Sequence, residues 1–402
     1  MYFRPTRAII NLKALKHNYN EVLRRLPKGC GVLAMVKADA YGHGVIPVSK
    51  ALARLGVNCL GVATVEEGME LRQAGIRKPI LVMGGLWGQG ERAAKVMIRH
   101  KLIPVVHSAG VVTLLNRLAK KLKVQGKLEV HLKIDTGMTR LGVTLQALPD
   151  VIEKLKSATY LKLGGVMTHL AFRFDPKYTK YQIQNFKRGG EKILEAFGEI
   201  PVWHIANSAA VIEGGPITWG SFAGAQDDRN ASRDTLHEIR DTRYASRFWA
   251  RPGIMLYGIP PYPEFAKKVK LKPVMSLVSQ VALLKNVPKG TRVSYNGTFT
   301  IKRPSRIAVI PIGYADGFPW SASNKAQVLI EGRRCKILGR VTMDMIMVDV
   351  TDCAKARVGS RVTLLGRQGK KEILADDLAK WASTIPYEIV CRISKRMPRI
   401  YI

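Results

Sequence analysis

The stretch Gly31-Val-Leu-Ala-Met-Val-Lys-Ala-Asp-Ala-Tyr-Gly-His-Gly44 joins an apolar run to a polar segment that ends in glycines. The apolar part, Gly31–Val36, is typical of a buried strand, and Lys37 follows it directly. A helix-like stretch at Val48–Leu55 comes next, so the segment predicts a strand, a loop and a helix. Burying a lone ammonium group is costly, so a lysine here needs a partner or a covalent role. Lys37 is therefore the first candidate for a functional residue.

The alternation of strand-like and helix-like stretches continues outward from this segment to about residue 258. The helix-like stretches place their apolar residues on one face, as helices that cover a sheet do. Eight strands separated by helices are the count of a (β/α)8 (TIM) barrel, although a doubly wound parallel sheet would show the same alternation. The predicted strands are Gly31–Val36, Cys59–Ala63, Ile80–Met83, Ile103–His107, Leu128–Ile134, Leu163–Met167, Val202–Ile205 and Ile254–Tyr257.

The last third of the chain has a different pattern. From about Lys272, short β-rich runs are interrupted at close intervals by glycine, proline and aspartate, which is typical of a mainly β domain. The length of 402 residues also exceeds the size at which one hydrophobic core usually stops growing. We therefore predict an α/β protein with an N-terminal (β/α)8 TIM barrel over residues 12–258, followed by a mainly β C-terminal domain over 259–402. Arg4–Asn11 is strand-like, and residues 1–11 are expected to join the second domain.

The composition argues against several classes of protein. The N-terminus has no apolar stretch typical of a signal peptide, and no apolar run approaches the ~20 residues that span a bilayer, so we expect a cytoplasmic protein without membrane contact. The five cysteines form no C-x-x-C pair and the eight histidines are not clustered, so we expect neither disulfides nor a metal site. The formal charge of +35 is extreme, but its lysines and arginines are spread along the chain without a nucleic-acid-binding motif. We interpret the charge as a solvated surface, not as a nucleic-acid site.

Polar motifs also lie at the ends of three later strands of the predicted barrel and at the start of the eighth. Because the active sites of such barrels lie at the C-terminal ends of the strands, these motifs should converge with Lys37. Barrels also often bind phosphate with the loops after strands seven and eight, which is where Ser208, Gly253 and Ile254 occur. The motifs are Lys133-Ile-Asp-Thr-Gly-Met-Thr-Arg-Leu-Gly142, Met167-Thr-His169, His204-Ile-Ala-Asn-Ser208 and Arg251-Pro-Gly-Ile254.

The segment Met35–Gly44 closely resembles the cofactor-attachment signature of the alanine racemase family, whose members use pyridoxal 5′-phosphate (PLP). The resemblance assigns to Lys37 the Schiff base with the cofactor and to Tyr41 a hydrogen bond to its phosphate. The motif that starts at Lys133 resembles the second signature of the family, in which Arg140 pairs with the cofactor's phenolic oxygen and the substrate carboxylate. A guanidinium suits this role because its fixed fork binds a carboxylate through two hydrogen bonds. Lys133 matches a lysine that is carbamylated in some members.

The resemblance extends over about residues 5–400 and implies further contacts to the cofactor. Arg251 matches the arginine that faces the pyridine nitrogen. Because a guanidinium holds its own protons, the ring stays a weaker electron sink, which favours proton exchange at Cα over transamination. His169 matches a histidine that links this arginine to the catalytic tyrosine. The further cofactor-binding residues that the resemblance implies are Asn207, Ser208, Gly253, Ile254 and Tyr387.

Matches in the predicted β domain imply that two chains build each site. The segment Arg292-Val-Ser-Tyr-Asn-Gly-Thr298 resembles the one that carries the family's catalytic tyrosine, here Tyr295. With Lys37, it would give one base on each face of the planar intermediate. Tyr314 matches a residue at the entrance to the site, and Met343 one whose backbone N–H binds the substrate carboxylate. In this family these residues serve the barrel of the neighbouring subunit, so the resemblance implies a homodimer with composite active sites.

The resemblance thus implies an alanine racemase, an isomerase that interconverts L-alanine and D-alanine and would supply D-alanine for peptidoglycan. Three alternatives are a non-catalytic PLP carrier, a PLP decarboxylase on the same architecture and a racemase of broader specificity. Tyr295, Tyr314 and Met343 argue against the carrier, and Arg251 disfavours the decarboxylase. One departure from the family is a long polar insert near residues 216–247, which we expect to form a surface excursion.

Overall fold

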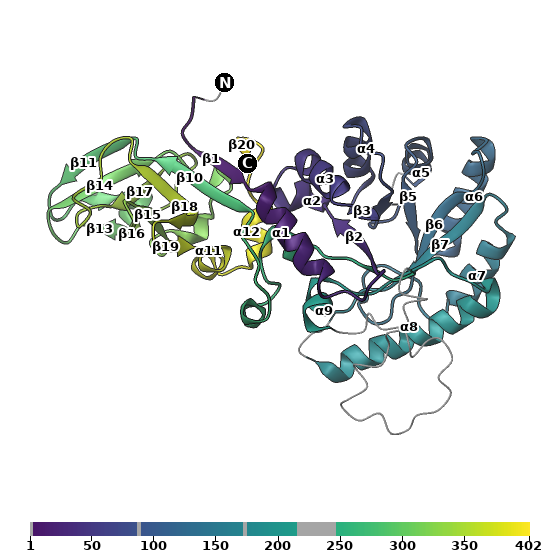
Figure 1. Cartoon of the computed structure of the whole chain (residues 1–402). Coiled ribbons are helices and arrows are strands. Elements are labelled where there is room, and N and C mark those ends of the chain that lie inside the picture. The colour runs from purple at the N-terminus through teal and green to yellow at the C-terminus, as the bar shows by residue number, and fades with distance from the viewer. Residues whose placement is uncertain (1–2, 87–89, 172–174, 215–246) are drawn as a thin grey trace.

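The computed structural model describes residues 3–86, 90–171, 175–214 and 247–402 (Figure 1). The insert near residues 216–247 lies outside the described residues except for its last position. Figure 1 shows two bodies side by side: a parallel sheet surrounded by helices, and a β-rich body that contains the first strand and the last one. This confirms the prediction of an α/β barrel followed by a mainly β part, whereas the domain bounds at residues 258 and 259 stay a prediction.

The barrel is one parallel sheet with the strand order β8-β7-β6-β5-β4-β3-β2-β9. A bridge between Trp203 in β8 and Phe248, next to β9, joins the two ends of this sheet and brings it to near closure. Its strands are β2 (Gly31–Met35), β3 (Cys59–Val62), β4 (Ile80–Val82), β5 (Ile103–Val106), β6 (Leu128–Lys133), β7 (Leu161–Met167), β8 (Val202–His204) and β9 (Trp249–Ala250).

Helices with one buried face cover the outside of the barrel (Figure 1). Polar side chains cap the N-termini of several of these helices. Ser108 accepts a hydrogen bond from Val111 N, and Thr64 forms a capping box with Glu67. The helices are α1 (Leu12–Leu23), α2 (Lys37–Gly42), α3 (Val45–Arg54), α4 (Val65–Gln73), α5 (Gly90–Arg99), α6 (Ala109–Lys121), α7 (Leu148–Ser157), α8 (Pro176–Phe197) and α9 (Ser208–Glu213).

The eighth strand was predicted at the wrong place. Ile254–Tyr257 is a 3-10 helix, η2, and the eighth strand is the short β9, which ends just before Arg251. All four residues of η2 are buried, and the hydroxyl of Tyr257 donates a hydrogen bond to the carbonyl of Met35 at 2.8 Å. In a short run whose residues are all buried, apolar and polar positions do not alternate, so the sequence does not distinguish a strand from a helix.

The β-rich body is a ten-stranded sheet whose main path is β11-β14-β17-β16-β15-β18-β10-β1-β20. The N-terminal strand β1 (Arg7–Ile10) lies in this sheet, where it pairs antiparallel with β10 and parallel with β20. The remaining strands are β10 (Met275–Gln280), β11 (Leu283–Val287), β14 (Ser305–Ile310), β15 (Gln327–Ile330), β16 (Arg333–Leu338), β17 (Ile346–Asp349), β18 (Arg361–Gln368), β19 (Lys371–Ile373) and β20 (Arg399–Tyr401), with β12 (Arg292–Val293) and β13 (Phe299–Thr300) as a separate pair.

Two short helices, α11 (Ala375–Ala382) and α12 (Pro386–Cys391), complete this body and bring it to the barrel. The Arg399 side chain donates a hydrogen bond to the carbonyl of Gly42 at 3.1 Å, just after the first barrel strand. One cluster of buried apolar side chains runs from the barrel into the β-rich body, so the two bodies share a hydrophobic core. The end of the chain is therefore fixed beside the Lys37 segment.

Candidate active site

A cavity of about 760 Å³ lies at the C-terminal ends of the barrel strands. This is the end at which barrels of this type hold their active sites. Side chains from β2, β6, α9 and α12 and from the segments after β7 and β9 meet there. The predicted site residues in its lining are Lys37, Tyr41, Arg140, His169, Asn207, Ser208, Arg251, Gly253, Ile254 and Tyr387.

Lys37 begins a left-handed turn. The four residues that follow it, from Ala38 to Tyr41, have φ between 53° and 54°, although none is glycine. Each L-residue in this conformation costs roughly 1–2 kcal/mol, so the surroundings must stabilise the turn. Val45 N donates a hydrogen bond to the Asp39 carboxylate at 2.7 Å and closes it. Backbone strain is thus concentrated at the predicted cofactor lysine.

Several cations share the cavity, and each affects the others. Burial and the positive charge of Arg140 lower the pKa of Lys37. Burial, followed by Arg140 and Arg251, lowers the pKa of Lys133 to about 8. The cations among the described lining residues outnumber the one carboxylate, Glu67, and such a net positive charge attracts anionic groups, such as a phosphate or a carboxylate.

Arg251 is buried and its guanidinium is held by backbone carbonyls. Nη2 donates to Thr168 O at 2.6 Å and to Ile205 O at 3.2 Å, and Nη1 donates to His204 O. Burial lowers the pKa of Arg251 to about 9, so it remains protonated at neutral pH. Nη2 also lies 3.4 Å from His169 Nδ1. Burial and the Arg251 charge lower the pKa of His169 to about 3, which leaves this nitrogen neutral and able to accept the hydrogen bond.

A set of small donors lies on another wall of the cavity. The hydroxyl oxygen of Ser208 accepts hydrogen bonds from Gly253 N at 2.9 Å and from Met255 N at 3.5 Å. A Cβ at position 253 would lie 2.4 Å from the Tyr41 hydroxyl oxygen, so this close approach requires glycine. Burial raises the pKa of Tyr41 and of Tyr387, which keeps both phenols protonated as donors. Hydroxyls and backbone N–H groups in this arrangement suit an anion.

Glu67 is a site residue that the sequence analysis missed. Its carboxylate lines the cavity and accepts hydrogen bonds from Ala38 N at 2.6 Å and from Ala63 N at 2.7 Å. It therefore links the start of the Lys37 turn to the end of β3. The available signal was the sequence Thr64-Val-Glu-Glu67, which is typical of a helix start with a capping box. Cys391 also lines the cavity, and no pattern in the sequence indicated it.

Two further histidines lie beneath Arg251 in the barrel interior. His204 Nδ1 is 3.2 Å from Arg251 Nη1, and His204 Nε2 is 2.8 Å from His131 Nδ1. Because a guanidinium only donates, Nδ1 of His204 accepts and its Nε2 carries the proton that His131 accepts. The other nitrogen of His131 lies 3.4 Å from Glu129 Oε1. Arg251 therefore donates to His204, and His204 donates to His131, in the direction away from the cavity.

The structure does not bring the predicted β-domain residues to Lys37. Tyr295, Tyr314 and Met343 are 70%, 41% and 51% exposed on the β-rich body. Among the described residues, the lining of the Lys37 cavity includes none of the three. In one copy of the chain, the predicted second base thus lies away from the predicted first one.

The described residues offer neither a cluster of metal ligands nor a membrane-spanning helix. No group of three or more histidine, cysteine, aspartate or glutamate side chains is arranged there to hold a metal ion. No helix among the described residues is long and apolar enough to cross a membrane.

Comparison with known proteins covers nearly the whole chain. Residues 10–221 match the family model of the alanine racemase N-terminal domain, and residues 274–401 match that of its C-terminal domain. An alanine racemase of Halothermothrix orenii is 41% identical over 99% of this chain and 97% of its own length, and one of Citrifermentans bemidjiense is 40% identical over 99% of both.

Solved structures agree with these sequence matches. The alanine racemase of Clostridium difficile 630 has a TM-score of 0.85 at 34% identity, covering 100% of this chain and 97% of its own. The Bacillus anthracis alanine racemase with bound L-Ala-P has a TM-score of 0.84 at 32% identity, covering 100% and 96%. The strand-end motifs, the cavity that they build and these matches lead to one conclusion: the chain belongs to the alanine racemase family.

Proposed function

We propose that this chain interconverts L-alanine and D-alanine with pyridoxal 5′-phosphate held at Lys37. The observation that carries the proposal is the cavity in which Lys37, Arg140 and Arg251 lie together at the strand ends. The relatives named alanine racemase match this chain over almost its full length, which supports the same reaction here. D-alanine for peptidoglycan, made in the cytoplasm, is the role that this reaction would serve.

The residues of the cavity fit PLP. Its phosphate is an anion, and Tyr41, Ser208 and Tyr387 offer hydroxyl groups beside the backbone of Gly253 and Ile254. The missing side chain at position 253 lets the Tyr41 hydroxyl approach the backbone there, so that both can face the phosphate. Lys37 would hold the cofactor covalently and Arg251 would face its ring nitrogen. When bound, PLP supplies an electron sink that acidifies the Cα proton of the attached amino acid.

Lys37 is the base that we assign to one face of the substrate. An amine takes up a proton only when it is unprotonated, and the lowered pKa of Lys37 brings that form closer to neutral pH. Arg140 lines the same cavity and would pair with the substrate carboxylate through its two parallel donors. Together, these residues would hold the substrate and exchange the proton at Cα.

Arg251 determines which reaction follows. Its hydrogen bonds to backbone carbonyls fix the guanidinium, and its pKa of about 9 keeps it charged. It therefore presents donors only, and the described groups bonded to it are backbone carbonyls and two histidines, with no carboxylate among them to hold a proton on the ring nitrogen. A weak sink favours return of the proton to Cα, which supports racemisation over decarboxylation or transamination.

The second base would come from a neighbouring copy of the chain. Tyr295 is well exposed and lies away from the cavity of its own chain, as do Tyr314 and Met343. A head-to-tail homodimer would place these residues at the partner's barrel. Trp320 and Met345 are also large and exposed on the β-rich body, as expected for a surface that another protein covers. Tyr314 and Tyr387 at the entrance would favour a small substrate such as alanine.

Measuring D-alanine formation from L-alanine tests the proposal. Wild type, Lys37→Ala and the control Lys162→Ala, which changes an exposed lysine on β7, would be supplied with PLP. Lys37→Ala removes both the cofactor's attachment point and one base. It should reduce the rate of D-alanine formation by about 1000-fold or more and remove the visible absorbance of the bound cofactor, whereas the control should retain both. If wild type binds PLP through Lys37 and leaves alanine unchanged, the proposal is wrong and larger amino acids become the candidates.

A further inference from the structure

We propose that Arg4, Asp316, Arg396 and Asp344 form a positioning cluster for the active site of the neighbouring subunit. The cluster fixes the two loops that carry Tyr314 and Met343. The inference rests on the proposed function, because it concerns residues that a second copy of the chain would use. None of the four lines the Lys37 cavity of its own chain, among the residues that the structure describes. Their role is to hold other residues in place, not to touch the substrate.

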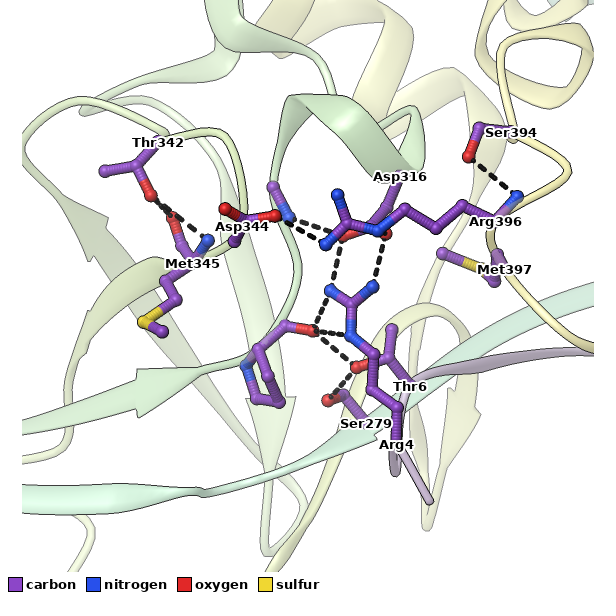
Figure 2. Close-up of polar contacts among 12 residues, drawn as sticks. Arg4, Thr6, Ser279, Asp316, Thr342, Asp344, Met345, Ser394, Arg396 and Met397 are labelled. Atoms are coloured by element: carbon purple, nitrogen blue, oxygen red, sulfur yellow. Dashed lines mark hydrogen bonds and ion pairs between the residues drawn. The ribbon is translucent and has the colours of Figure 1, made fainter. Parts of the chain in front are cut away.

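Asp316 is the centre of the positioning cluster. Its side chain is fully buried, and Arg4 binds it through two hydrogen bonds, Nη1 to Oδ1 at 2.5 Å and Nη2 to Oδ2 at 2.6 Å (Figure 2). Removing a carboxylate from water is costly unless such a partner compensates. Asp316 Oδ2 also accepts a hydrogen bond from Gly313 N at 3.0 Å. The carboxylate therefore closes the turn η5 (Tyr314–Asp316), on which Tyr314 is displayed.

This turn is bonded to the second loop through the backbone. Tyr314 N donates to Thr342 O at 3.0 Å, and Ala315 N donates to Met343 O at 3.1 Å. A Cβ on Gly313 would lie 2.2 Å from Thr342 O, so the two loops approach as closely as glycine allows. Whatever fixes the turn therefore also fixes the backbone at Met343.

Arg396 joins the two loops a second time. Nη2 donates to Asp344 Oδ1 at 2.5 Å, and Nε lies 3.4 Å from Asp316 Oδ1 (Figure 2). Asp344 directly follows Met343, the residue whose N–H is expected to bind the substrate carboxylate. An unpaired aspartate at this position would repel that carboxylate. Arg396 offsets its charge, and the cluster as a whole has two cations and two anions.

The start of the chain clamps the segment before the turn. Arg4 donates to the carbonyl of Pro311 from Nε at 3.1 Å and from Nη2 at 2.6 Å. The Thr6 hydroxyl donates to the same carbonyl at 2.6 Å and lies 2.8 Å from the Ser279 hydroxyl (Figure 2). Residues before β1 thus hold a loop of the β-rich body, which gives the N-terminal segment a function beyond its strand.

Substituting Arg396 tests the cluster, because this side chain is 45% exposed and its loss leaves the Arg4–Asp316 pair intact. In the Arg396→Gln holoenzyme we expect faster amide hydrogen exchange at residues 314–315 and 343–345. We also expect KM for alanine to rise about fivefold with kcat changed less than twofold, as for a lost contact to the bound carboxylate. Arg4→Lys keeps the charge but loses the paired hydrogen bonds, so it should change the same amides.

The matched control is Arg303→Gln. Arg303 binds Asp352 through two hydrogen bonds of 2.8 and 2.7 Å, in the same body of the protein but with both partners largely exposed. This variant should change neither the exchange of the two loops nor KM. Exchange in Arg396→Gln and Arg4→Lys equal to that of wild type would overturn the proposal. Because hydrogen exchange does not depend on turnover, this failure is distinguishable from a failure of the racemase assignment.

Discussion

Lys133, Lys37 and Arg251 show at the residue scale how the cavity gives up stability for function. Each has a pKa below its usual value because burial removes water from the charge, and neighbouring cations lower the pKa of the two lysines further. Such a group destabilises the folded chain until an anion arrives. A phosphate and a carboxylate would both relieve this, which is why the cavity suits a phosphorylated cofactor and an amino acid.

Lys133→Met should stabilise the protein in the absence of PLP. Lys133 has a folded pKa of about 8 against a usual value of 10.5, so the folded chain binds fewer protons between these pH values and stability rises with pH there. The penalty is therefore complete below pH 8 and fades above it. We expect Tm of the variant at pH 7 to exceed that of wild type by about 2 °C, with a smaller gap at pH 10.

The measurement uses CO2-free buffer, because carbamylation would replace the positive charge of Lys133 in wild type with a negative one. Lys162→Met, at an exposed position on β7, is the control and should leave Tm unchanged. A Tm of Lys133→Met at or below that of wild type at pH 7 would contradict the account of the cavity charges.

Arg251→Lys should be costly although the charge is kept. A lysine has three donors on one atom and cannot reach the carbonyls of Thr168, His204 and Ile205 together. Leaving one buried carbonyl unpaired costs about 1–3 kcal/mol of unfolding free energy. Urea unfolding should show this loss, and D-alanine formation should fall about tenfold or more. Unchanged values in both assays would show that the guanidinium fork is dispensable.

At the element scale, β6 has a polar face toward the barrel interior: Glu129, His131 and Lys133. Barrel interiors are usually filled with branched apolar side chains. The neighbouring β7 compensates with glycines at 164 and 165, where a Cβ would meet Glu129 and His131, respectively, at 2.4 and 2.6 Å. The register between the two strands also shifts between Val130 and His131. A bulge and two glycines thus make the room for the buried histidine.

Gly165→Ala should therefore destabilise the protein. The added methyl group would collide with the His131 ring, and overpacking of this kind costs about 1–3 kcal/mol. Gly110→Ala is the control, because position 110 in α6 has open space and alanine raises helix stability by about 0.5–1 kcal/mol. Chemical denaturation should give opposite signs for the two variants. Two stabilising substitutions would show that the barrel interior has space beside His131.

Strands and site motifs were predictable to different degrees. The strands from β2 to β8 have apolar runs bounded by polar or glycine residues, and the predicted positions are close to the observed ones. The prediction put the eighth strand at the wrong residues for two reasons. The true strand, β9, has only two residues, and the buried helix η2 has the apolar composition of a strand. Glu67 and His204 were missed because only the fold brings them to the Lys37 turn and to Arg251, and His131 was missed because only the closed barrel brings it to His204.

At the scale of the whole molecule, the barrel holds half of the proposed chemistry and the β-rich body displays the other half. The shared hydrophobic core fixes the two bodies to each other, so Tyr295 cannot simply fold back onto the cavity of its own chain. The order of the motifs along the sequence was enough to predict both the barrel and the β-rich body. The relation between two chains could not be derived from it, because nothing in one sequence shows which copy a residue serves, and here the family resemblance alone supplied it.

The central claim is that Lys37 of one chain and Tyr295 of another act in one alanine-racemising site. It is tested most directly by D-alanine formation after Lys37→Ala and Tyr295→Ala chains, each inactive alone, are co-expressed, allowed to pair at random and purified together. A mixed dimer has one site with both residues and one with neither. Random pairing should therefore restore about a quarter of the wild-type activity, because half of the dimers are mixed and each has one intact site of two. A mixture that stays as inactive as its parents would contradict the account.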